Sequence, residues 1–154
     1  MNKLITGVKE RHLRQNCDER GRVVELLRSD WSEFIKFGQV YITTAYPGAV
    51  KAWHYHKKQT DTFICIKGMM KVVLYDSRKN SKTKGMVNEF FVGENNLKII
   101  QIPPEVYHGF KCISAHESII LNIPTNVYNY NNPDEYRLPV NTRKIPYSWK
   151  RKDR

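Results

Sequence analysis

A short stretch of this sequence combines residue types that bind metal ions or transfer protons. His54 and His56 are separated by one residue, and Asp61 follows five residues after the second histidine. The side chains of a β-strand alternate between its faces, so a strand here would direct both imidazoles to one face and Trp53 and Tyr55 to the other. Imidazoles beside a carboxylate suit a divalent transition metal, and they also suit a general base held by an acid. The residues alone leave both chemistries open.

Glycines flank this stretch, and a second histidine motif follows it. Gly48 precedes the histidine pair, Gly68 follows the aspartate, and "PPEVYH" carries Pro103, Glu105 and His108. This arrangement resembles the two motifs of the cupin family, with aspartate where glutamate is usual and glutamate where the second motif has glycine. The resemblance implies an all-β double-stranded β-helix, the jelly-roll cupin barrel.

The cupin resemblance also implies a candidate metal set. In metal-binding cupins the ligands are the paired histidines, the acidic residue and the later histidine, which here are His54, His56, Asp61 and His108. Three imidazoles and a carboxylate would suit iron, manganese, nickel or zinc. Other cupins use the same barrel without a metal, and the histidines would then be polar residues lining the barrel.

A second resemblance covers nearly the whole chain. The segments "CDERGRVVELLRSD", "KAWHYH", "IPPEVYHGF" and "YNNPDEYRLP" resemble the dTDP-4-dehydrorhamnose 3,5-epimerase family of sugar-nucleotide epimerases. Such enzymes remove a proton next to a 4-keto group and reprotonate the enolate from the opposite face, which requires no metal. The resemblance implies a nucleotide-diphosphate sugar as substrate and a homodimer in which an N-terminal segment crosses to the partner.

The epimerase resemblance assigns roles to individual residues. His54 falls on the family's catalytic base, and His108 falls on its second active-site histidine. The residues expected to contact or position the nucleotide sugar are Arg20, Glu25, Gln39, Lys51, His56, Tyr128 and Tyr130. Some of these have ordinary structural alternatives, because Arg20 and Glu25 would also suit a cross-strand ion pair and the two tyrosines would suit packing of a C-terminal arm.

Other residues occupy three positions of the family's catalytic set. Asp61 replaces an active-site lysine and so becomes a catalytic candidate, and the catalytic tyrosine aligns with Leu121 or Asn122, neither of which can donate a proton. Thr142 stands where the family has the aspartate that orients the base. The sequence favours an epimerase with altered catalytic groups. The alternatives are a metal-dependent cupin enzyme, which would need a divalent transition metal, and a non-catalytic sugar-nucleotide binding protein.

The elements that must position these residues are predicted to be short strands. Turn signals recur every eight to twelve residues, as in a sandwich or barrel, and the linkers are too short for crossover helices. A short helical turn is expected near Trp31–Ile35, and the Pro- and Asn-rich stretch from residue 125 onward predicts an irregular C-terminal arm. The length of 154 residues fits one domain over 1–154.

The overall composition limits the partners and the compartment. Lysine and arginine outnumber aspartate and glutamate by 26 to 15, and the net charge of +11 suits an anionic partner. Basic residues are neither concentrated on one helix nor interleaved with aromatics, so no nucleic acid is expected. Cys17, Cys65 and Cys112 form no framework of pairs, which suits a reducing cytoplasm. The sequence contains no apolar run of membrane-spanning length.

Overall fold

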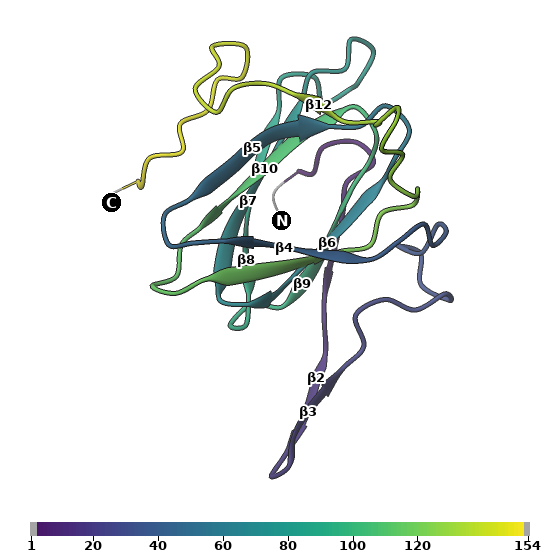
Figure 1. Ribbon diagram of the computed structural model, residues 1–154, viewed down its shortest axis with the longest axis vertical. Coiled ribbons are helices and arrows are strands. Elements are labelled where there is room, and N and C mark those ends of the chain that lie inside the picture. The colour runs from purple at the N-terminus through teal and green to yellow at the C-terminus, as the bar shows by residue number, and fades with distance from the viewer. Residues whose placement is uncertain (1–2, 153–154) are drawn as a thin grey trace.

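The computed structural model describes residues 3–152 as two antiparallel sheets with a separate hairpin (Figure 1). The strands are β1 (Lys9–His12), β2 (Gln15–Asp18), β3 (Gly21–Val24), β4 (Tyr41–Ala45), β5 (Val50–Tyr55), β6 (Asp61–Lys67), β7 (Met69–Asp76), β8 (Val87–Gly93), β9 (Lys98–Ile102), β10 (Val106–Cys112), β11 (Ser118–Asn122) and β12 (Tyr136–Arg137). One five-stranded sheet, sheet A, has the order β1-β9-β6-β11-β4, and the other, sheet B, has the order β12-β5-β10-β7-β8.

The strands pair in a nested order. Strand β4 pairs with β11, β5 with β10, β6 with β9, and β7 with β8, all antiparallel. A ribbon folded in this way, with its first strand against its last, is a jelly roll. The predicted all-β double-stranded β-helix is therefore confirmed.

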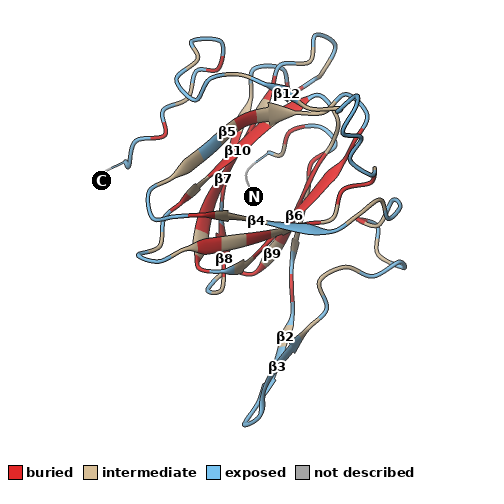
Figure 2. Ribbon diagram, viewed as in Figure 1, coloured by how far each residue is buried: buried red, intermediate tan, exposed pale blue. Residues whose placement is uncertain are grey.

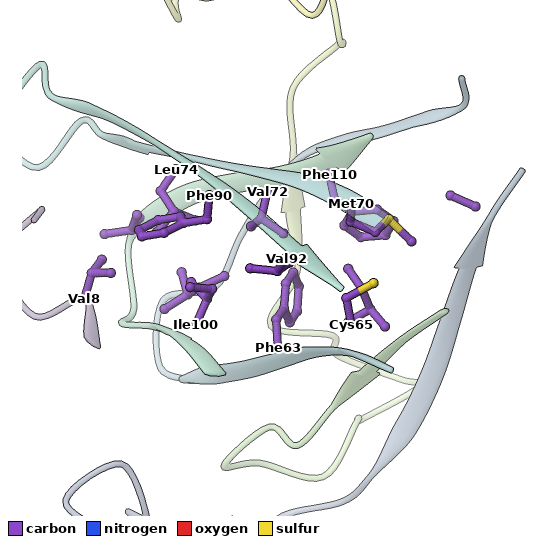
Figure 3. Packing of buried hydrophobic residues seen from close by; sticks show 14 of the residues in the cluster. Val8, Phe63, Cys65, Met70, Val72, Leu74, Phe90, Val92, Ile100 and Phe110 are labelled. Carbon is purple, nitrogen blue, oxygen red and sulfur yellow. The ribbon is translucent and has the colours of Figure 1, made fainter. Parts of the chain in front are cut away.

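The core lies between the facing sheets. Alternation along β7 and β10 turns Val72, Leu74 and Phe110 inward, where they meet Phe63 and Ile100 of sheet A (Figure 3). Figure 2 shows this burial along both sheets, whereas the β2–β3 hairpin is mostly exposed. Complete burial of each such side chain contributes about 1.5–3 kcal/mol, so the sandwich is a rigid frame for residues at its open end.

The outer face of sheet B is covered by the C-terminal segment. Trp53 of β5 is 1% exposed and packs in a cluster with Val73, Ile145 and Trp149. Its ring centroid lies 5.1 Å from that of Trp149 and 5.8 Å from that of Tyr147. Strand β5 thus has an apolar cluster on one face, which leaves its other face to the inside of the barrel.

Two turns of the cupin motifs have left-handed backbone. Gly68 joins β6 to β7 with φ 67°, and a Cβ there would lie 2.3 Å from the Ser118 hydroxyl oxygen, so glycine is required. Glu105 precedes β10 with φ 64°, although the family motif has glycine at this position. The Glu105 N–H donates a 2.7 Å hydrogen bond to the His56 carbonyl, which ties the second motif to the first.

The helical turn predicted near Trp31–Ile35 was wrong. Two successive turns form instead, closed by hydrogen bonds from Trp31 N–H to the Arg28 carbonyl (3.2 Å) and from Phe34 N–H to the Trp31 carbonyl (3.0 Å). The carbonyls of Ser32 and Glu33 accept hydrogen bonds from the side chains of Lys9 and Gln101. A helix would need those carbonyls for its own N–H groups.

The Pro- and Asn-rich stretch from residue 125 is irregular, as predicted, apart from the two residues of β12. Within residues 3–152, no helix has the length and apolar character needed to cross a bilayer.

Candidate active site

A cavity of about 800 Å³ lies between the two sheets. Strands β5 and β10 of sheet B line one wall, and β4 and β6 of sheet A line the other. The stretch from Asn126 to Arg137 adds further lining residues. The cavity therefore draws on segments that are distant in sequence and are brought together by the nested strand pairing.

The histidines face this cavity as the strand period predicts. His54 lies in β5 and His56 lies in the loop after it, and both line the cavity. Trp53 lies in the cluster on the outer face. His108 of β10 is the cross-strand partner of His54, and their ring centroids lie 6.1 Å apart. The structure thus brings the three imidazoles to the same wall of the cavity.

Asp61 is the buried centre of a polar cluster. Its Oδ2 lies 3.1 Å from His56 Nε2 and 3.3 Å from His108 Nε2, and the residue is 2% exposed. Its Oδ1 accepts hydrogen bonds from Gln59 Nε2 (2.8 Å) and Asn122 Nδ2 (3.0 Å). Burial opposes the charged carboxylate, but the hydrogen bonds from His108 and His56 outweigh it and hold the pKa of Asp61 well below its usual range.

The other nitrogen of each clustered histidine faces a backbone carbonyl. His56 Nδ1 contacts the Asp134 carbonyl, and His108 Nδ1 lies 3.1 Å from the Val106 carbonyl. A carbonyl only accepts, so each Nδ1 carries a proton. In neutral rings both Nε2 atoms would then be acceptors aimed at an acceptor carboxylate. Either added protons or a cation must lie between these atoms. Burial opposes a charged His56, but the hydrogen bond to Asp61 outweighs burial and raises the pKa of His56.

This cluster fits a metal ion in the chemistry of its donors. One ligand atom from each of His56, Asp61 and His108 lies within 4.8 Å of the other two. A ligating histidine usually donates its second N–H to a carbonyl or carboxylate, and both histidines here do so. His54, which the sequence placed in a set of four ligands, is not in this group. Three of the expected ligands converge, and His54 is left for other chemistry.

His54 has a different environment from the other two histidines. Among residues 3–152, no group forms a hydrogen bond to its imidazole. Burial, followed by the neighbouring His108, lowers the pKa of His54 to about 4. Arg137 and Glu135 also line the cavity and act on the ring in opposite directions. His54 is therefore a neutral imidazole at neutral pH, with nitrogen available to accept a proton.

The other expected contact residues separate into two groups. Gln39, Lys51, Tyr128 and Tyr130 line the cavity. The Tyr128 N–H donates a 3.1 Å hydrogen bond to Gln39 Oε1, Lys51 Nζ lies 3.4 Å from Thr43 Oγ1, and Tyr130 is 88% exposed. These four are in position to meet a ligand that enters the cavity.

Arg20 and Glu25 do not line the cavity of their own chain. Arg20 lies at the tip of the β2–β3 hairpin, and its guanidinium bonds Asp18 at 2.6 Å. Glu25 follows β3 and bonds Arg28 at 2.5 Å. Figure 1 shows the hairpin projecting away from the sandwich. Thr142 also lies outside the cavity, in a turn closed by its N–H on the Pro139 carbonyl.

Sequence reasoning missed several residues of the site. Asp134 accepts three backbone N–H groups of residues 57–59, and its carbonyl meets His56. Asn122, rather than Leu121, points into the barrel, since Leu121 packs on the outer face of sheet A against a cluster that includes Ile64 and Ile99. Tyr41 places its hydroxyl 2.9 Å from Asn122 Nδ2. Strand alternation could have indicated the face of Tyr41, but only the register of β4 against β11 identifies its partner.

Residues 16–136 match the family described as polysaccharide biosynthesis C-terminal domain. The chain belongs to this family. A relative from Haloferax volcanii, named probable low-salt glycan biosynthesis epimerase Agl13, is 45% identical over 147 residues, which cover 94% of each chain. The spore coat polysaccharide biosynthesis protein SpsL of Bacillus subtilis is 39% identical and covers 95% of this chain and 97% of its own.

A solved structure described as a dTDP sugar isomerase, from Desulfovibrio desulfuricans G20, superimposes with a TM-score of 0.89 at 32% identity. It covers 94% of this chain and 92% of that chain. The predicted membership in an epimerase family with a jelly-roll fold is therefore confirmed. The cavity residues of this chain can therefore be compared with those of sugar-nucleotide epimerases.

Proposed function

We propose that this chain is an epimerase that inverts a carbon next to the 4-keto group of a 6-deoxy nucleotide sugar during synthesis of a rhamnose-like or other surface polysaccharide. The observation that carries this proposal is a neutral, unbonded His54 imidazole on the wall of a cavity that also presents Lys51 and Gln39. The relatives named as an epimerase and a polysaccharide biosynthesis protein, and the dTDP sugar isomerase, support it. Residues 1–154 are proposed to form one domain, and this domain would supply the cavity.

The proposed chemistry begins at His54. Its free nitrogen accepts the proton on the carbon beside the keto group, and the electron pair moves to the keto oxygen as an enolate. His108 is the cross-strand partner of His54, and its two ring nitrogens are held by Asp61 and by the Val106 carbonyl, so it would fix the cavity wall beside the base. Lys51 gives a charge-assisted contact to the diphosphate. Return of a proton to the other face of the carbon completes the inversion.

Deuterium exchange tests this function directly. The protein is incubated with dTDP-4-keto-6-deoxyglucose, and separately with its UDP counterpart, in deuterated water, and NMR reports exchange at C3 and C5. Changing His54→Asn is expected to reduce exchange by about a hundredfold or more, the usual scale for a lost general base. His116→Asn is the matched control, because His116 is an exposed histidine outside the cavity. Exchange at the parent rate in His54→Asn would remove the base from this residue.

A metal-assisted form of the reaction is the second candidate. The observation that favours it is the convergence of His56 Nε2, His108 Nε2 and Asp61 Oδ2, three atoms that repel one another unless a proton or cation lies between them. A divalent ion held by these residues would polarise the keto group of a substrate. Elemental analysis of protein prepared without a histidine tag, with exchange measured before and after chelation, separates the two candidates. Undiminished exchange in metal-free protein would reject the metal-assisted form.

The position of the hairpin supports the proposal that the protein is a homodimer. Arg20 at its tip is exposed and distant in the fold from the strands that line its own cavity, and apolar residues on and beyond the hairpin are exposed, including Val23, Phe37 and Ile42. Docking on a second copy would cover these apolar residues and bring Arg20 and Glu25 to the partner's cavity. Light scattering during size exclusion tests the assembly, and a monomer at micromolar concentration with full activity would contradict it.

A further inference from the structure

An epimerisation that starts at His54 needs a proton donor on the other side of the sugar. This inference rests on the proposed function. His54 and His108 belong to sheet B, and β4 and β6 of sheet A form the opposite wall, where a donor for the other face of the sugar would stand. The two residues that align with the family's catalytic tyrosine cannot serve. Leu121 packs against Ile64 and Ile99 on the outer face of sheet A, and Asn122 is fully buried and has no acidic proton.

Tyr41 stands on this opposite wall. It is the first residue of β4, lines the cavity, and is the cross-strand partner of Asn122 on β11. Its hydroxyl oxygen lies 2.9 Å from Asn122 Nδ2. Tyr128 and Tyr130, the candidates from the sequence, pack against each other with ring centroids 5.0 Å apart, and Tyr130 is 88% exposed. Tyr41 is therefore the phenol held in place by the buried network.

The direction of the hydrogen bonds leaves the phenol proton available. Asn122 Oδ1 accepts the backbone N–H of Thr62 at 3.1 Å, so its amide nitrogen must face the other way. That nitrogen donates to Asp61 Oδ1 and to the Tyr41 hydroxyl oxygen. The hydroxyl oxygen is thus an acceptor in this contact, and no group in residues 3–152 accepts its hydrogen. Tyr41 lines the cavity and is 42% exposed, so this hydrogen is free to meet a ligand there.

We propose that Tyr41 is the catalytic acid that delivers a proton to the face of the sugar opposite His54. In the first step the C–H bond breaks, its proton goes to the His54 nitrogen, and its electron pair forms the enolate. In the second step the Tyr41 O–H bond breaks and its proton forms the new C–H bond from the other side, while the enolate becomes a ketone again. The imidazolium and phenolate that remain are reset by proton exchange with water.

The surroundings of Tyr41 suit this role. Burial, followed by the charge of Asp61, raises the pKa of Tyr41 to about 12, so the phenol is protonated before the reaction. The phenolate that forms in the second step keeps the hydrogen bond from Asn122, which would have most value at that moment. Asn122 thus stands at a position that aligns with the family's catalytic tyrosine, and its amide holds Tyr41 on the neighbouring strand β4.

Changing Tyr41→Phe separates the two proton transfers. The ring stays and the proton is lost, so inverted product is expected to fall by about a hundredfold or more. Deuterium exchange at the same carbon should persist, because the His54 imidazolium can exchange with solvent and return a deuteron to the original face. Both quantities are read from one NMR time course with dTDP-4-keto-6-deoxyglucose in deuterated water. The Tm shift given by thymidine diphosphate shows that the variant is folded and binds nucleotide.

The matched control is Tyr46→Phe. Tyr46 directly follows β4 and is 72% exposed, so this variant should invert at the parent rate. Inversion at the parent rate in Tyr41→Phe would overturn the proposal. Inversion and exchange falling together, with the nucleotide shift intact, would also overturn it, because the hydroxyl would then act in the first step. A parent protein without exchange on either nucleotide sugar would instead reject the proposed function.

Discussion

The Asp134 carboxylate is expected to hold the loop between β5 and β6 in place. Its Oδ1 accepts the Lys57 N–H at 2.9 Å, and its Oδ2 accepts the N–H groups of Lys58 at 2.8 Å and Gln59 at 3.1 Å. Although burial opposes ionisation, these N–H groups lower the pKa of Asp134, so it accepts as a carboxylate. Gln59 in turn donates to Asp61. Asp134→Ala would release this loop and loosen the polar cluster.

The expected cost follows from these three hydrogen bonds. Each contributes about 1 kcal/mol, since two of the three are at the protein surface, and the sum is about 2–3 kcal/mol. For a chain of this size, about 2–4 °C of Tm correspond to 1 kcal/mol, so Asp134→Ala should melt roughly 4–12 °C lower. Asp134→Asn keeps one acceptor oxygen and should lose about half as much.

Thermal melting and amide hydrogen exchange together check this expectation. Exchange should accelerate at residues 57–59 and stay unchanged in the centre of β7. Glu117→Ala is the control, because Glu117 lies in the turn between β10 and β11 and should change stability by less than about 0.5 kcal/mol. The reasoning is refuted if Asp134→Ala melts with the parent or if residues 57–59 keep their protection from exchange.

Three further outcomes are expected. Thymidine diphosphate at about a hundredfold excess over its Kd should stabilise the protein by about 2.7 kcal/mol, and a clearly smaller rise in Tm for Lys51→Ala would locate the diphosphate. Hydrogen bonds from Arg78, Ser81 and Thr83 outweigh burial and lower the pKa of Asp76. The stability that this carboxylate contributes is therefore present above about pH 4 and is lost as the pH falls through the lowered pKa. Asp76→Asn should cost about 2 kcal/mol of stability near pH 7 and much less in acid, and a difference that does not change with pH would contradict this. Glu105→Gly should raise stability by about 1 kcal/mol by relieving left-handed strain, and a lower Tm would show that the Glu105 side chain outweighs it.

The local patterns of the sequence were sufficient for much of this site. A period of two placed His54 and His56 toward the cavity and Trp53 away from it, because that rule depends only on the strand itself. Motif spacing then brought Asp61 and His108 to the same place, because both motifs end at the same end of the barrel.

What the sequence could not provide depended on register and on long-range contacts. The family tyrosine aligned equally with Leu121 and Asn122 until the pairing of β11 with β4 and β6 assigned their faces. Asp134 lies in an irregular stretch more than seventy residues from the loop it binds, so no local pattern links the two. The turn near Trp31 was mistaken for helix because its carbonyls are taken by side chains of other strands.

The two-sided burial of β5 limits how this protein can evolve. One face of the strand carries His54 toward the cavity, and the other carries Trp53 into the cluster with Tyr147 and Trp149. A single inserted or deleted residue would exchange these faces, placing indole in the cavity and imidazole in an apolar layer. Neither outcome can be repaired by one further substitution. Lineages can therefore vary the residues on the cavity face one at a time, but the length of this strand is fixed for as long as the C-terminal segment packs against it.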